Sequence, residues 1–95
     1  MKATASPTRA PKTFALDMVS QNRFSPDVLT LRGGDSVLVT NRDRAPHDFT
    51  IGELGVESGT MHQGDTFRYR FGPTGTFTFV CTIHQGMEGT LRVTR

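Results

Sequence analysis

Short segments in which apolar and polar residues alternate recur along the chain from Thr13 onward. Such period-two alternation is typical of strands with one buried face. It is clearest in Phe-Arg-Tyr-Arg-Phe at residues 67–71, where the aromatic side chains share one face and the arginines the other. Glycine-rich turns such as Gly33-Gly34-Asp35 separate the segments. The pattern predicts strands at residues 13–19, 28–32, 36–41, 47–52, 66–71, 76–81 and 90–94.

The spacing of these segments predicts an all-β domain, because about seven strands in roughly 80 residues are typical of a β-sandwich or barrel. The 95-residue chain has ten Gly, five Pro and seven Phe but few runs of Ala, Leu, Glu or Lys, so a helical bundle is excluded. No apolar run approaches the roughly 18 residues of a membrane span. We assign residues 13–95 to one domain and expect residues 1–12 to be a disordered tail or linker.

The charge of the chain argues against nucleic-acid binding. The formal net charge is +2, but Lys2, Arg9 and Lys12 lie in the first 12 residues, which contain no acidic residue. The predicted domain is therefore almost neutral, whereas a nucleic-acid interface needs excess positive charge on the fold itself. The N-terminus also lacks the apolar segment of a secretory signal. We expect either a cytosolic protein or a sequence that begins after a removed signal or anchor.

The single cysteine, Cys81, cannot form an intramolecular disulfide. It is therefore a buried thiol, a nucleophile, an intermolecular bridge or a metal ligand. Strand parity places it on the same face as Phe77 and Phe79. His84 and Met87 follow at intervals of three residues, in a short loop that contains glycine. This loop presents a thiolate, an imidazole and a thioether to one point.

A fourth donor, His47, shares strand parity with Phe49 and Ile51 and so belongs to an inward face. A thiolate, two imidazoles and a weak thioether are the donors of trigonal His2Cys copper sites with a long axial Met. Zinc sites prefer four strong donors, and a thioether is a poor one. Each residue alone is more often a core or surface residue, but the joint spacing predicts one copper ion held by His47, Cys81, His84 and Met87.

Residues 75–93 (GTFTFVCTIHQGMEGTLRV) resemble the C-terminal copper signature of the cupredoxins, the type 1 blue copper proteins. Residues 25–51 resemble the upstream segment that carries the first ligand, and the ligand-loop spacing is closest to that of the amicyanins. The resemblance implies a Greek-key β-sandwich of seven or eight strands with copper at one end. It also implies single-electron transfer rather than enzymatic catalysis, in a monomer outside the cytoplasm, periplasmic or otherwise extracytoplasmic.

The resemblance further implies that redox partners dock transiently around the exposed edge of His84. The predicted docking surface consists of Ala45, Pro46, Ile83, Gln85 and Gly86. Acidic residues, Asp43, Asp48, Glu53, Glu57 and Glu88, are candidates for steering such a partner.

Two residues depart from the family pattern. Asp48 stands where relatives often carry the Asn that ties the two ligand loops together, and an ionised carboxylate near the metal would lower its potential. Ile83 stands where many relatives carry Pro before the second His. The third histidine, His62, lies in a turn-like stretch, and we expect it to be no ligand.

Three other functions compete with electron transfer. A copper carrier or sensor of an extracytoplasmic copper-handling system has the same donors. A cysteine nucleophile with His84 or His47 as its base lacks a third orienting group. An oligonucleotide-binding β-barrel lacks both basic charge and an aromatic RNA-binding signature.

Overall fold

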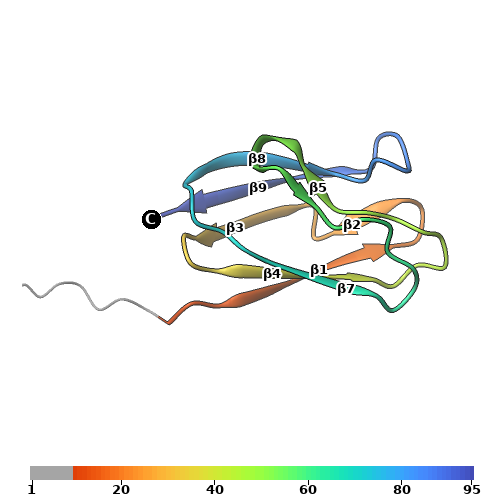
Figure 1. Ribbon diagram of the computed structural model, residues 1–95, viewed down its shortest axis with the longest axis horizontal. Helices are drawn as coiled ribbons and strands as arrows, with labels where there is room; N and C mark the ends of the chain where they lie inside the picture. The colour runs from red at the N-terminus through yellow and green to blue at the C-terminus, as the bar shows by residue number, and fades with distance from the viewer. Residues whose placement is uncertain (1–9) are drawn as a thin grey trace, which may run out of the picture.

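The computed structural model describes residues 10–95, which form a sandwich of two β-sheets (Figure 1). In spatial order, one sheet contains β2 (Arg23–Ser25), β1 (Thr13–Val19), β4 (Ser36–Asn41) and β7 (Thr66–Arg70). The other contains β3 (Val28–Arg32), β9 (Glu88–Thr94), β8 (Gly75–Val80), β5 (Thr50–Ile51) and β6 (Val56–Glu57), and a 3-10 turn, η1 (Gly52–Leu54), joins β5 to β6. The all-β sandwich expected from the sequence is confirmed.

Two of the strand pairs are parallel. β1 lies parallel to β4, and β3 lies parallel to β9, whereas the other pairs are antiparallel. Parallel neighbours cannot be joined by a tight hairpin, so the chain crosses between the two sheets. These crossings join the layers into one domain around a shared core.

The core is formed by the inward faces of both sheets. Phe49, Phe71 and Phe79 are fully buried, and Phe24 packs edge-on against Phe79 with ring centroids 4.9 Å apart. The predicted alternation at residues 67–71 is also present, because Phe67 and Tyr69 are half-buried whereas Arg68 and Arg70 are exposed. The same core includes Phe79 of β8 and Cys81, the residue that follows β8.

Besides one-residue shifts at the ends of β7 and β8, the observed strands differ from the predicted ones in three respects. β2 and β6 are additional, and each is too short to show a periodic pattern. The strand predicted at residues 47–52 reduces to Thr50–Ile51, because the Asp48 and Phe49 N–H groups donate to the side chains of Cys81 and Ser58 rather than to a neighbouring strand. The last strand begins at Glu88, two residues earlier than expected.

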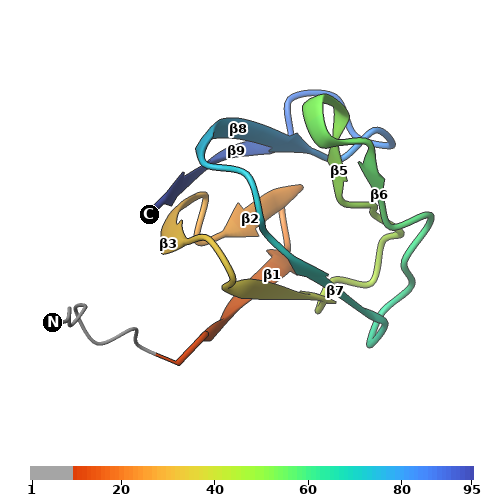
Figure 2. The same ribbon diagram turned by 60° about the vertical axis from the view of Figure 1, so that its left-hand side comes forward.

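The two candidate ligand loops, residues 42–48 and 81–87, lie at the same end of the sandwich, and the C-terminus lies at the opposite end (Figures 1 and 2). At that opposite end the Lys12 N–H donates to Asp35 Oδ1 (2.9 Å), and the Lys12 carbonyl accepts from the Ser36 N–H (2.9 Å). Most of the predicted tail, residues 1–9, lies outside the described residues. Within residues 10–95, no helix is long and apolar enough to cross a membrane.

We predict that Gly89→Ala destabilises the fold by about 1–3 kcal/mol, the usual cost of overpacking. A Cβ at Gly89 would lie 2.6 Å from the Asp27 carbonyl oxygen and would overlap the Phe79 ring. Gly52→Ala is the control, because a Cβ there has no heavy atom within 4 Å. Urea unfolding of the metal-free protein measures both, and equal stability of the two variants would contradict the prediction.

Candidate metal centre

The loop that carries His47 follows β4 and is organised by Asn41, whose side chain is fully buried. The Asn41 Nδ2 donates to the carbonyls of Ala45 (2.9 Å) and Met61 (2.8 Å), and its Oδ1 accepts from the Asp43 N–H (2.8 Å). Residue His47 then pairs with Met61 through two backbone hydrogen bonds of 2.7 and 3.1 Å. A loop without regular structure is thereby fixed on both sides of the imidazole.

The ring of His47 has 0 % exposure and points into the protein. Its Nε2 lies 2.9 Å from Asp43 Oδ2, while its Nδ1 lies 3.8 Å from Cys81 Sγ. The hydrogen bond with His47 is the main cause that holds the pKa of Asp43 below its ordinary value. Asp43, expected from the sequence to be a steering residue at the surface, therefore contacts a candidate ligand directly.

Cys81 follows the last residue of β8 and is 4 % exposed. Its Sγ lies 3.4 Å from the Asp48 backbone N, which donates to the sulfur. Hydrogen bonds to a sulfur ligand are one of the means by which a protein adjusts a copper site. The thiol is thus placed between the core and the first ligand loop.

The separation of the two atoms fits a shared metal ion. Donors at about 2.0–2.3 Å from one metal, at tetrahedral or trigonal angles, lie about 3.5–4 Å apart. The distance of 3.8 Å between Cys81 Sγ and His47 Nδ1 falls in this range. A soft thiolate beside an imidazole is also the donor pair that copper prefers.

The loop between β8 and β9 positions His84 and Met87. The His84 and His47 ring centroids are 4.6 Å apart, and His84 Nε2 lies 3.0 Å from the Pro46 carbonyl oxygen. Met87 is 2 % exposed, and its carbonyl accepts from the Cys81 N–H (2.9 Å). All four predicted residues thus gather at one end of the sandwich.

No three of the His, Cys, Asp and Glu side chains in residues 10–95 already converge as a closed metal cluster. The His84 ring lies at the half-exposed edge of the site, with its Nε2 3.0 Å from the Pro46 carbonyl oxygen. His47 and Cys81 form the buried part of the site, and His84 forms its outer part.

Asp48 connects the two ligand loops. Its Oδ1 accepts from the Thr82 backbone N–H (2.8 Å) and from the Thr50 hydroxyl (3.2 Å), and its Oδ2 accepts from the Thr82 hydroxyl. Residues 42–48 connect β4 of one sheet to β5 of the other, whereas residues 81–87 connect β8, the neighbour of β5, to β9. The carboxylate therefore makes the tie that the family resemblance assigns to Asn at this position.

The other sequence-predicted residues lie at the surface. The His62 side chain is 77 % exposed and contacts Asp65 (3.8 Å) rather than a candidate ligand. Ile83 is 42 % exposed, which is unusual for a large apolar residue.

The sequence reasoning missed two contributors to the site, Asn41 and Met61, and it missed the contact of Asp43 with His47. A buried Asn at a strand end and an acidic residue four positions before His47 are visible in the sequence, but neither has a spacing that identifies it. Met61 acts through its backbone, which no side-chain pattern reveals.

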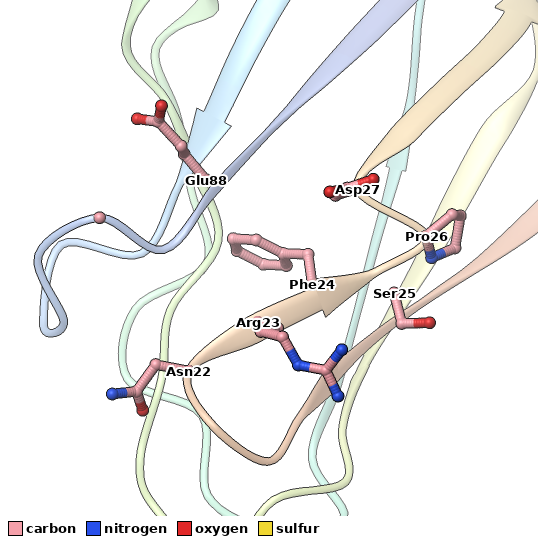
Figure 3. Close-up of a pocket in the computed structure, with 8 residues that line it drawn as sticks. Asn22, Arg23, Phe24, Ser25, Pro26, Asp27 and Glu88 are labelled. Carbon is pink, nitrogen blue, oxygen red and sulfur yellow. The ribbon is translucent and has the colours of Figure 1, made fainter.

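A shallow, solvent-open pocket of about 360 Å³ lies beside the second ligand loop (Figure 3). Arg23, Phe24, Asp27 and Glu88 line it, and Gly86 is its one contribution from the ligand loop. It contains no candidate ligand, so it is not the metal site.

We predict that Asp48→Ala lowers the free energy of unfolding of the metal-free protein by about 1–3 kcal/mol, because it removes the hydrogen bonds that the Asp48 carboxylate accepts from Thr50 and Thr82. Asp48→Asn keeps an oxygen that accepts from the Thr82 N–H, so we expect it to lose clearly less. Urea unfolding compares the three proteins. Equal losses in the two variants would show that the negative charge, rather than the hydrogen bonds, stabilises the junction.

Comparison with known proteins supplies the family. Residues 1–93 match the cupredoxin-like domain family. A plastocyanin of Scenedesmus fuscus is 30% identical over 74% of this chain and 85% of its own length. Amicyanin-alpha of Methylorubrum extorquens is 28% identical over 75% of this chain, which spans only 64% of that protein.

A solved structure of a reduced amicyanin variant superposes with a TM-score of 0.78 at 26% identity, over 85% of this chain and 81% of the other. The fold, the gathering of thiol, imidazoles and thioether at one end, and these matches agree. The chain therefore belongs to the cupredoxin-like family of plastocyanin and amicyanin.

Proposed function

We propose that this protein transfers single electrons through one copper ion bound by His47, Cys81 and His84, with Met87 as a weak axial ligand. It is a small blue copper electron-transfer protein, and its relatives are plastocyanin and amicyanin. The observation that carries the ligand proposal is the 3.8 Å separation of Cys81 Sγ from His47 Nδ1 at a buried site. Bound copper supplies the Cu(II)/Cu(I) couple.

The chain's own residues suit this role because they hold the donors in a rigid frame. Two buried donors, His47 and Cys81, rest on the aromatic core, and hydrogen bonds fix the loop around each. A rigid site that is acceptable to both oxidation states keeps reorganisation small. With the four positions filled by protein donors, no site remains for a substrate, which favours electron transfer over enzymatic catalysis.

The His84 edge is the proposed route for electrons. The exposed Pro46, Ile83, Gln85 and Gly86, with the half-buried Ala45, surround it as a small and mostly uncharged surface. Such a surface suits brief docking of a monomer with a redox partner, since electron-transfer encounters use small interfaces. We place the protein in an extracytoplasmic compartment such as the periplasm, as the family resemblance implies.

A copper carrier or sensor is the alternative function, because it would use the same set of donors. The relatives of this chain favour electron transfer over copper carriage, because the matched proteins are plastocyanin and amicyanin. A carrier would release its copper readily to a competing chelator. An electron-transfer protein would keep its copper through repeated reduction by ascorbate and reoxidation.

We expect the purified protein to take up one Cu(II) per chain with an intense blue absorption that ascorbate bleaches. Cys81→Ser removes the colour but leaves the fold, because the core aromatics supply most of the stability. His62→Ala is the control and keeps the colour, since His62 lies outside the site. Loss of colour in His62→Ala, or retained colour in Cys81→Ser, would refute the ligand proposal.

The docking proposal is tested by electron self-exchange between oxidised and reduced copies of the copper-loaded protein, followed by NMR line broadening. Ile83→Lys places like charges opposite one another when two His84 edges meet, so we expect exchange to slow by about tenfold or more. Thr74→Lys is the control, because Thr74 is exposed in the turn between β7 and β8, at the end of the sandwich opposite the ligand loops. Equal rates for the two variants would place the electron route elsewhere.

A further inference from the structure

The two candidate imidazole ligands have different hydrogen-bond acceptors on their Nε2 atoms. His84 faces a neutral backbone carbonyl, that of Pro46 (3.0 Å), at the surface. His47 faces a carboxylate, that of Asp43 (2.9 Å), and is itself fully buried. Among residues 10–95, Asp43 forms the only carboxylate contact with the ring of a candidate ligand.

We propose that Asp43 is a positioning residue of the copper centre: it fixes the His47 tautomer and makes this imidazole a stronger donor to Cu(II) than a neutral acceptor would. The inference rests on the copper-binding function proposed above. It assigns to Asp43 a role that neither the ligand motif nor the position of Asp43 in the sequence indicates.

The position of Asp43 does not depend on His47 alone. The Asp43 N–H donates to Asn41 Oδ1 (2.8 Å), and Asp43 Oδ1 accepts from the Arg44 N–H (2.9 Å). Since Oδ1 is already engaged, the second oxygen, Oδ2, is held toward the imidazole. The acceptor is therefore in place before any metal binds.

This geometry determines the tautomer of His47. An ionised carboxylate only accepts hydrogen bonds, so Nε2 carries the hydrogen and Nδ1 keeps its lone pair. Nδ1 is the atom that faces Cys81 Sγ at 3.8 Å. The ring nitrogen that Asp43 leaves free is thus the one beside the thiol.

The negative charge of Asp43 remains effective at this position. Within residues 10–95, no arginine forms an ion pair with it, and Arg42 pairs instead with Asp17 at 3.1 Å. The Asp43 side chain is only 18 % exposed and the His47 side chain is not exposed, so water screens their contact weakly. A charged partner on the outer nitrogen raises the basicity of a ligating imidazole. Because Cu(II) carries the higher charge, a more basic imidazole stabilises bound Cu(II) more than bound Cu(I). The reduction potential of the bound copper therefore falls.

The first test measures the reduction potential of the copper-loaded protein in Asp43→Ala, Asp43→Asn and Asp65→Asn. Changes in such outer partners typically alter metal affinity by about 10–100-fold. We expect Asp43→Ala to lower the ratio of Cu(II) to Cu(I) affinity by about tenfold, which raises the potential by about 59 mV. Asp43→Asn keeps an acceptor oxygen without the charge, so its shift should be smaller.

Asp65→Asn is the matched control. It removes the same unit charge, but Asp65 contacts the exposed His62 rather than a candidate ligand. A general charge effect would shift its potential as much as that of the Asp43 variants. Equal shifts in Asp65→Asn and both Asp43 variants would overturn the proposal.

The second test needs no copper. In the metal-free protein, the ¹⁵N chemical shifts of His47 report which ring nitrogen carries the hydrogen. We expect the hydrogen on Nε2 in the wild type and a mixed or reversed tautomer in Asp43→Ala, with Asp65→Asn unchanged. A wild-type hydrogen on Nδ1 would also overturn the proposal.

The two failures are distinguishable. If the wild type binds no copper or stays colourless, the proposed function fails, whatever the tautomer of His47. If the wild type turns blue and all variants share one potential, the function stands and the role of Asp43 is refuted.

Discussion

The site depends on one constraint: its donors come from two separate loops, so the loops must be fixed relative to each other at this end of the sandwich. His47 lies in the loop that connects β4 of one sheet to β5 of the other, and Cys81 follows β8, the neighbour of β5. The carboxylate of Asp48 bridges the gap, because it accepts both the backbone N–H and the hydroxyl of Thr82. The Asp48 N–H in turn donates to the sulfur of Cys81. Asp48 thereby holds the two loops together and also hydrogen-bonds the thiol of Cys81.

Behind this junction, rigidity comes from packing. The ring of Phe79 lies two residues before Cys81 on the same strand face, against Gly89 of the neighbouring strand. Protein interiors are packed as tightly as organic crystals, so the packed Phe79 and Gly89 move little. Toward the solvent the restraints weaken, from the buried His47 to the half-exposed His84. A site with a buried, restrained His47 and a more accessible His84 suits a metal centre that retains its metal while electrons pass through its exposed edge.

The sequence predicts the sandwich, which the structure confirms, and it points to four candidate ligands, because both inferences rest on local information. Alternation reveals which face of a strand is buried, and the Cys81, His84 and Met87 spacing is short enough to recognise directly. The roles of Asn41 and Asp43 depend on the path of an irregular loop, which no periodic pattern encodes. The short strands β2 and β6 likewise exist because neighbours complete their hydrogen bonds. Asp48 lies between these cases: the family pattern points to its position, but only the structure shows the carboxylate bonded to Thr82.

The pairing of β3 with β9 also affects how the protein acquires its site. Residues 28–32 of this pair contact residues 90–94, so the sandwich closes only when nearly the whole chain is available. Contacts between residues so far apart in sequence slow folding, because a long loop must close first. Until that step the core around Cys81 is incomplete, so the thiol is more accessible than in the folded protein, where it is 4 % exposed. In an oxidising compartment, the newly made chain would therefore pass through a period in which its future copper ligand is exposed to oxidation.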